Sequence, residues 1–303
     1  MGKKQIKIKK KKIDLFIVLV HIFFVLFCVC FIVPFMVVIA ASFTSEDWLI
    51  YGSGFGLLPK EFTTEAYRSA FANGERVIRA YGVTIAQSAI GTVSSVLVAA
   101  LCAYPLSRSN FRFKKPITIF LIITMLYGAG MVPTYILYSR VYKIANTFWI
   151  YILPGITGGA MSTFVYKTFF KSIPESLFES AKIDGAKELT IFFKIAMPLS
   201  TPVLATQAFI GLVGRWNNYS TSMIYIRDES LYTLQYLLQR IMAEAQFLQS
   251  LAEKYNIEIN KSSLPGESLK YAMCVIAAGP MIAVFPFFQK YFEKGMVVGS
   301  VKG

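Results

Sequence analysis

Charged residues are absent from six long stretches of the chain, and this pattern predicts its secondary structure. Each stretch has 19 or more residues without Asp, Glu, Lys or Arg, and most of its side chains are apolar. A helix of about 20 apolar residues crosses a bilayer core of about 30 Å. We therefore predict an all-α membrane protein with six transmembrane helices, at about residues 15–43, 81–106, 116–138, 147–169, 195–214 and 271–289.

The segments between these spans differ in charge, which predicts their orientation. If the N-terminus is cytoplasmic, the inner segments hold 19 Lys and Arg, and the outer segments hold 12. The net charge is then +13 inside and +1 outside. Because short cytoplasmic loops carry the excess of Lys and Arg, we expect both termini in the cytoplasm of a cell-membrane protein. A basic tail (1–14) then precedes the six-span domain (15–295), which has an inner loop at 171–194 and an outer loop at 215–270.

The net charge of +14 does not indicate a nucleic-acid partner. The basic residues lie in short runs next to spans, where anionic lipid headgroups attract them by about 1 kcal/mol each. The first apolar stretch is far longer than the core of a signal peptide, which has roughly 7–15 residues, so we expect a retained first span. The four cysteines lie inside spans, and the chain has one histidine, His21. We therefore expect no disulfide and no metal site.

Small residues and helix breakers mark particular spans. The second span is rich in Gly, Ala and Ser, which let helices approach closely in lipid, so we expect it to pack at the centre of a bundle. Gly128, Gly130 and Pro133 predict a kink in the third span. The outer half of the fourth span contains Pro154 and Gly155, followed by two further glycines. Its freed backbone groups need partners in protein or a wet cavity; a tolerated kink and a face lining an interior are both open.

The inner loop at 171–194 carries the clearest local pattern. Ser172 and Glu175 have the spacing of a capping box, which predicts a short helix that ends near Asp184. Gly185 permits the backbone turn that ends it, and Asp184 is expected to cap the next helix. Leu177 and Phe178 form an apolar ridge on this helix. Acidic residues accompany the ridge, which favours a protein groove over an anionic lipid surface.

The loop also resembles a known family. Its segment from Glu179 to Pro202 reads ESAKIDGAKELTIFFKIAMPLSTP and is similar to the EAA loop of ABC-importer permease subunits. The residues that match in register are Glu179, Ala181, Gly185, Ala186, Met197 and Pro198. Ser180 replaces the usual first alanine. The form Asp184-Gly185-Ala186 is typical of the carbohydrate branch.

Two outer segments extend the resemblance to roughly residues 15–295. The segment GLLPKEFTTEAYRSAF, which follows the first span, resembles the maltose-permease-like subunits, as does Trp216-Asn217-Asn218 after the fifth span. The first of these segments predicts a short helix capped by Thr63 or Thr64. The outer stretch from Leu231 to Tyr255 also has helical spacing.

The resemblance implies a type I ABC importer permease fold with a cytoplasmic coupling helix. It implies a carbohydrate importer, of oligosaccharides in particular, with a second homologous permease, two ABC ATPase subunits and an extracytoplasmic solute-binding protein as partners. ATP and Mg²⁺ would bind to the ATPase subunits, and this chain, which lacks a P-loop sequence, would carry no cofactor and catalyse no reaction. The residues expected to contact an ATPase are Leu177, Phe178, Glu179, Ser180, Ala181, Asp184, Gly185 and Ala186.

A carbohydrate path needs aromatic and neutral polar side chains that face an aqueous cavity. The candidates are Gln87, Tyr127, Tyr135, Trp216, Asn217 and Asn218, although packing or an interfacial aromatic belt also explains such residues. An importer of a non-sugar solute is the main alternative. A secondary transporter or channel is less favoured, because the spans contain no charged residue and the chain shows no inverted repeat.

Overall fold

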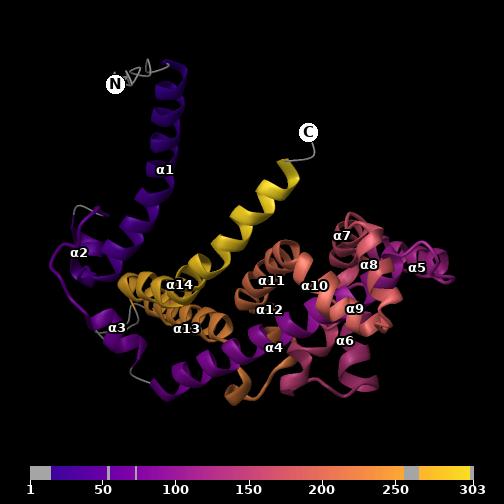
Figure 1. Cartoon of the computed structure of the whole chain (residues 1–303). Helices are drawn as coiled ribbons and strands as arrows, with labels where there is room; N and C mark the ends of the chain where they lie inside the picture. The colour runs from indigo at the N-terminus through magenta and orange to yellow at the C-terminus, as the bar shows by residue number, and fades with distance from the viewer. Residues whose placement is uncertain (1–14, 53–54, 72–73, 256–265, 301–303) are drawn as a thin grey trace, which may run out of the picture. The chain divides into compact units, whose positions relative to one another are not determined.

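The computed structural model describes residues 15–52, 55–71, 74–255 and 266–300. About four fifths of these residues are helical, and the described parts contain one isolated β-bridge and no strand. The predicted basic tail lies outside the described residues. The described residues form two compact bodies, one within residues 15–70 and 266–275 and the other within residues 71–255 and 276–300. Figure 1 labels the helices of both.

The first body joins segments from the two ends of the chain. It contains α1 (Leu15–Ser42), α2 (Glu46–Tyr51), α3 (Glu65–Ala70) and the start of α14 (Glu267–Ser300). The Glu46 carboxylate caps α14: Oε1 accepts the Glu267 N–H at 2.7 Å and Oε2 accepts the Ser268 N–H at 3.0 Å. A carboxylate at this end also complements the helix dipole. The predicted short helix is α3, which follows Thr64, and Thr63 accepts the Glu65 N–H.

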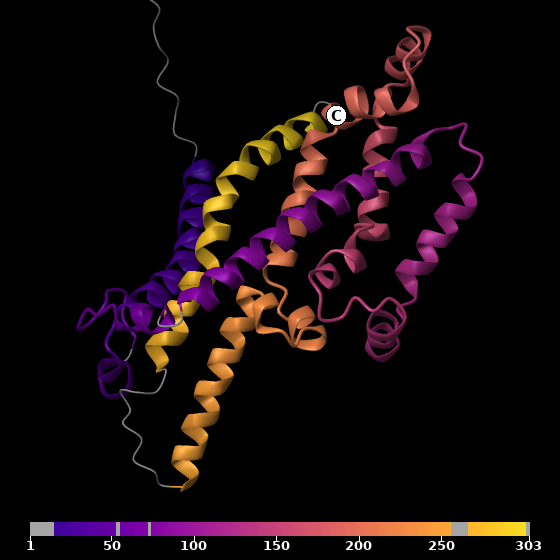
Figure 2. The same ribbon diagram turned by 90° about the horizontal axis from the view of Figure 1, so that it is seen from below.

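The second body is built around α4 (Gly74–Ser107), which corresponds to the second predicted span. This helix packs against α7 (Gly159–Lys171) and α11 (Thr201–Trp216) (Figure 2). Ala99, Ala100 and Ala103 are fully buried in these contacts. The prediction of a packing helix with small residues is therefore confirmed. The later part of α14 also belongs to this body, where Tyr81 and Trp216 donate to its Ile276 and Ala277 carbonyls.

Three of the spans are bent pairs of helical segments. The third comprises α5 (Lys114–Leu126) and a helical segment from Met131 to Val141, which meet at 112°. The bend contains Gly130 at φ +80°, which confirms the predicted kink. Counting each bent pair as one crossing, the described residues contain six candidate spans. The bent fourth span comprises η2 (Phe148–Tyr151), η3 (Leu153–Gly155) and α7. The bent fifth span comprises α9 (Glu188–Ile191), η4 (Phe192–Ala196), α10 (Met197–Leu199) and α11.

The fourth and fifth spans differ from the uniform helices that the hydrophobic pattern predicts. Two 3₁₀ turns, η2 and η3, form the outer half of the fourth span, and the bend to α7 is 48°. The α11 helix begins at Thr201 after an 80° bend, so Ile195 belongs to the segment before it. Glycine and proline lie at these breaks: Gly158 adopts φ +67° directly before α7, and Pro202, which has no backbone N–H, lies in the first turn of α11.

The outer part of the second body contains α12 (Ser220–Tyr225), η5 (Glu229–Leu231) and α13 (Leu234–Tyr255). The predicted helix from Leu231 to Tyr255 is therefore confirmed, with a start three residues later. The buried hydroxyl of Thr84 in α4 accepts the Leu234 N–H at 2.8 Å and satisfies one donor at the start of α13.

Candidate functional site

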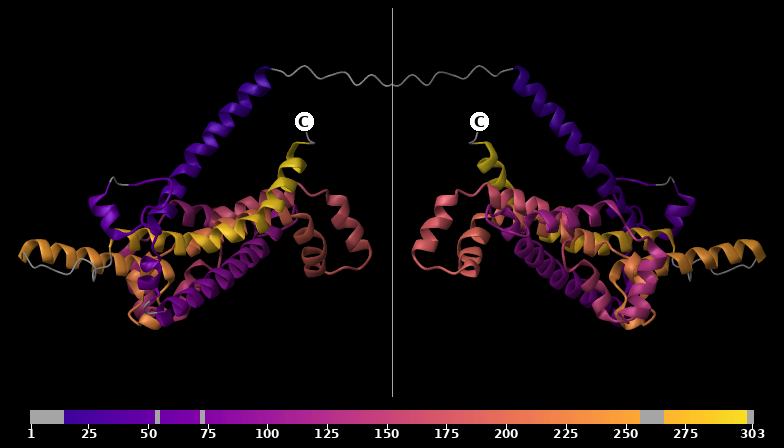
Figure 3. Two further views of the ribbon diagram at one scale, coloured as in Figure 1. Left: turned by 90° about the vertical axis from the view of Figure 1, so that its left-hand side faces the viewer. Right: turned by 90° about the vertical axis from the view of Figure 1, so that its right-hand side faces the viewer.

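The loop at residues 171–194, named the coupling loop here for the role that the resemblance implies, folds as a helical hairpin at one end of the second body (Figure 3). Its first helix is α8 (Glu175–Ile183). Gly185, with φ +77°, lies in the turn that follows this helix. The Gly185 N–H donates to the Lys182 carbonyl at 3.0 Å, and the Ala186 N–H donates to the Ala181 carbonyl at 2.9 Å. This pair of bonds is a Schellman motif. The predicted role of Gly185 in ending the helix is confirmed.

Two alanines complete that turn. Ala181 and Ala186 are partly buried and pack on the same hydrophobic cluster. They occupy the two positions whose apolar contact commonly accompanies a Schellman turn. The two alanines of this loop therefore have a packing role within the chain itself.

Both predicted side-chain caps are wrong. The residue that precedes α8 is Pro174, with no side-chain cap, and the Ser172 hydroxyl instead donates to the Phe169 carbonyl at 2.7 Å. Ser172 still belongs to the last turn of α7, because its N–H bonds to the same carbonyl. The second helix, α9, follows Lys187. Asp184 is the last residue of the turn that ends α8 and does not cap α9.

An aromatic cluster anchors α8 to the bundle. Phe178 is 1% exposed and contacts both the Tyr104 ring and the Arg108 guanidinium. The Arg108 guanidinium carbon lies 3.7 Å from the Phe178 ring centroid, which is a cation–π contact. Arg108 also donates to the Phe170 carbonyl at 3.1 Å, and its Nη1 lies 3.5 Å from Glu175 Oε2. The prediction of Phe178 as part of an outward ridge is therefore wrong, because this side chain faces the chain's own core.

A second link joins the hairpin to α4. The Tyr104 hydroxyl donates to Glu188 Oε2 at 3.0 Å, and Lys182 Nζ lies 2.8 Å from Glu188 Oε1. Glu188 is the first residue of α9, and its carboxylate thus contacts residues of both α4 and α8. A displacement of α8 is resisted at two points, the Phe178 cluster and this ion pair, and both connect to the inner end of α4.

The side chains on the outward side of α8 are exposed among the described residues. Leu177 is 44% exposed, and Glu179, Ser180 and Asp184 are also exposed. Ile183 is 86% exposed, more than any other large apolar residue of the described chain. Ile183 is not among the residues predicted to contact an ATPase, and its sequence context carries no signal for this exposure, because single apolar residues are common on protein surfaces. We define the outward face as Leu177, Glu179, Ser180, Ile183 and Asp184.

Two of the residues proposed for a substrate path have structural partners. Gln87 is buried in α4, and its amide donates to the Arg215 carbonyl at 2.9 Å and to the Ser88 hydroxyl at 3.1 Å. Trp216 is buried, and its Nε1 donates to the Ala277 carbonyl at 2.9 Å. Packing and backbone bonds account for both side chains, so we remove them from the candidate path.

The other four candidates are dispersed. Tyr127 is 77% exposed at the bend of the third span, and Tyr135 stacks on Tyr225 with ring centroids 5.6 Å apart. The Asn217 amide donates back to the Val213 carbonyl at 3.0 Å. Asn218 is the one candidate among the six that lines a cavity next to Arg215. Of the six candidates that the sequence suggested, one lines this cavity and the other five do not.

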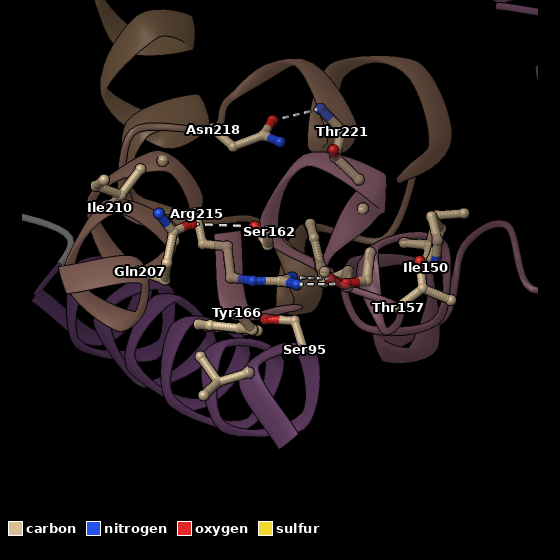
Figure 4. A pocket seen from close by; sticks show the side chains of 18 residues that line it. Ser95, Ile150, Thr157, Ser162, Tyr166, Gln207, Ile210, Arg215, Asn218 and Thr221 are labelled. Atoms are coloured by element: carbon tan, nitrogen blue, oxygen red, sulfur yellow. Dashed lines mark hydrogen bonds between the residues drawn. The ribbon is translucent and has the colours of Figure 1, made fainter. Parts of the chain in front are cut away.

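That cavity has a volume of about 540 Å³ and lies between α4, the broken fourth span and α11 (Figure 4). Arg215, from the last turn of α11, extends across it. Its Nη1 donates to the Tyr151 carbonyl at 3.0 Å, and its Nη2 donates to the Gly155 carbonyl at 3.1 Å. The prediction that the broken fourth span needs partners for its freed backbone groups is confirmed. The hydrophobic pattern predicts Arg215 as the first residue of the outer loop and gives no sign that its side chain enters a cavity.

The comparisons with known proteins agree with this architecture. Residues 95–298, which include the coupling loop and the cavity, match the family described as "Binding-protein-dependent transport system inner membrane component". The chain belongs to this family. The polygalacturonan/rhamnogalacturonan transport system permease protein YtcP of Bacillus subtilis is 36% identical to this permease over 289 residues, which cover 95% of this chain and 99% of YtcP.

Two further proteins extend the comparison. The galactooligosaccharides transport system permease protein GanQ of Bacillus subtilis is 29% identical and covers 91% of this permease and 92% of its own length. One chain of a bacterial ABC transporter involved in the import of the acidic polysaccharide alginate has the same fold, with a TM-score of 0.76 and 27% sequence identity. The match covers 91% of this permease and 96% of the chain of the alginate transporter. The type I ABC importer permease fold expected from the coupling loop is confirmed.

Proposed function

We propose that this permease forms one half of the translocation path of an ATP-driven importer for oligosaccharides. A second homologous permease would form the other half, and an extracytoplasmic solute-binding protein would deliver the sugar. Two ATPase subunits would bind ATP and Mg²⁺ and carry out hydrolysis, so this chain would have no catalytic role. Relatives whose names specify oligosaccharides or polysaccharides support the substrate class.

The outward face of α8 is the observation that supports this function most directly. It presents an apolar residue, Ile183, beside acidic and small polar side chains, on a helix that is fixed from behind by Phe178. Such a surface suits a protein groove better than a lipid surface. The excess of positive charge on the same side of the membrane places the loop in the cytoplasm in this proposal. ATP-bearing subunits would approach from there.

The anchors of α8 suggest how force would reach the cavity. Movement of the hairpin acts on α4 through Arg108 and Tyr104, and the chain continues from the hairpin through α10 into α11. Both α4 and α11 contribute residues to the cavity, including Ser95 and Arg215. Closure of the two ATPase subunits would therefore alter the cavity through α4 and α11, which pack against each other and transmit displacement.

Uptake in proteoliposomes tests the proposal. The permease would be purified with its ATPase and reconstituted with the binding protein, and uptake of a labelled oligosaccharide would be measured with ATP on the side of the coupling loop. We expect uptake that requires ATP and is unaffected by an ionophore that collapses ion gradients. Uptake that persists without ATP but stops with the ionophore would favour a secondary transporter. Failure of a gently solubilised permease to retain any ATPase would contradict the coupling role of α8.

A further inference from the structure

Arg215 carries a charge that no acidic group of the described chain neutralises. The residues that line the cavity include no Asp or Glu, and the ion pairs found among the described residues do not involve Arg215. The guanidinium has five N–H donors. Two of them bond to the Tyr151 and Gly155 carbonyls, which leaves three without a partner among the described residues. A cation at the end of a membrane span without a counter-ion indicates a functional site.

The surrounding backbone is shaped to admit this guanidinium. A Cβ atom at Gly91 of α4 would lie 2.5 Å from Arg215 Nη1, and one at Gly155 would lie 2.8 Å from Nη2. Both distances are shorter than any normal contact, so the side chain could not take this position beside larger residues. Two carbonyls alone do not require a cation, since a neutral amide can donate to them at a lower desolvation cost. The two carbonyls therefore do not explain why a charged side chain occupies this position, whereas an anionic ligand would explain it.

The rest of the cavity wall is neutral and polar. Ser162 donates to Gln207 Oε1 at 3.1 Å, which leaves the Gln207 amide N–H groups available. Asn218 and Thr157 also line the space, and Figure 4 shows these side chains around the guanidinium. The Tyr166 hydroxyl is buried and has no hydrogen-bond partner, although a buried polar group usually has one. The accessible amide and hydroxyl groups of Gln207, Asn218 and Thr157 can bond a ligand with several hydroxyl groups.

We propose that Arg215 binds the carboxylate of an acidic sugar, a hexuronate unit of an oligosaccharide, within this cavity. The inference rests on the proposed function and names its substrate class, which the relatives leave open because some of them are named for acidic and others for neutral sugars. Arginine forms two parallel hydrogen bonds with a carboxylate, and three donors remain for that purpose. The amide and hydroxyl groups of the wall bind the sugar hydroxyls. A volume of about 540 Å³ lies within the range of ligand pockets.

Direct binding to the assembled complex tests this proposal. The permease–ATPase complex in lipid nanodiscs would be titrated with trigalacturonate and with its methyl ester, which has the same shape but no charge. The solute-binding protein is omitted, so that its own selectivity does not contribute. We expect the wild type to bind the acid at least about tenfold more tightly than the ester, and R215Q to reduce this preference to less than about twofold. Added salt should weaken binding of the acid alone.

Two further variants keep the test decisive if R215Q does not assemble. R215K keeps the charge but loses the planar pair of donors, so it should retain a reduced preference for the acid. G91A leaves every polar group in place and displaces the guanidinium, so it should lower the preference as R215Q does. Equal affinity of the wild type for acid and ester, or an undiminished preference in R215Q or G91A, would overturn the proposal while the sugar permease stands. Binding of neither trigalacturonate, its ester nor neutral oligosaccharides would overturn both.

Discussion

Replacing Gly185 isolates the backbone conformation on which the coupling helix depends. The residue has φ +77°, and a Cβ atom added there would meet nothing within 4 Å. The cost of a side chain is therefore conformational and not steric within this chain. A non-glycine residue in the left-handed region costs about 1–2 kcal/mol, and a β-branched residue costs more, about 2–3 kcal/mol. Asparagine tolerates this region and serves as the matched control.

These costs predict a graded series. If docking needs the turn as observed, Gly185→Ala should weaken ATPase binding by about 5–30-fold, because 1–2 kcal/mol corresponds to that factor. Gly185→Val should abolish detectable binding, and Gly185→Asn should stay close to the wild type. The dissociation constant would be measured by titrating purified ATPase onto permease in nanodiscs. Thermal unfolding of each variant provides the control for folding.

Two results would refute this reasoning. Wild-type ATPase affinity in Gly185→Val would mean that the turn does not position the docking surface. Equal loss in Gly185→Asn and Gly185→Val, with unchanged thermal stability, would mean that the partner packs against Cα and excludes any side chain. In that case the glycine would serve the interface and not the backbone.

Three other substitutions separate the two sides of α8. Phe178→Ala should destabilise the permease by about 3–5 kcal/mol and lower its melting temperature, whereas Phe178→Leu should cost less; an unchanged melting temperature in both would contradict the anchoring role. Ile183→Asp should weaken ATPase binding without a change in melting temperature, and Ile183→Leu should restore it. Equal binding by both Ile183 variants would remove this residue from the interface. Glu179→Lys should also weaken ATPase binding, with a stronger effect at low salt; unchanged binding and transport would show that Glu179 does not face a basic groove.

The sequence predicts the spans because charge in a bilayer core is costly, and this cost acts on each segment separately. It also predicts the turn at Gly185, since a left-handed residue has a local signature. The error at Phe178 has a different origin. Helical periodicity identifies an apolar face, but the contact that covers this face comes from Arg108, 70 positions earlier, and no local pattern specifies that pairing.

Arg215 shows the same limit at the other end of the bundle. Its position directly after a charge-free segment is typical of a loop cation, and the hydrophobic pattern gives no reason to place it inside. The break in the fourth span did indicate that carbonyls need donors, but the donor comes from α11, about 60 residues further on. The sequence indicates that carbonyls of the fourth span need hydrogen-bond donors, but tertiary packing determines that Arg215 is the donor.

The cap that Glu46 places on α14 has a consequence for synthesis of the chain. Its partners Glu267 and Ser268 are 221 and 222 residues later, so the first body cannot be completed while most of the chain is still being made. During translation the Glu46 carboxylate remains without these donors until the last span has emerged, and the long closure slows this step. The order of synthesis therefore makes the cap on α14 one of the last contacts of this body to form.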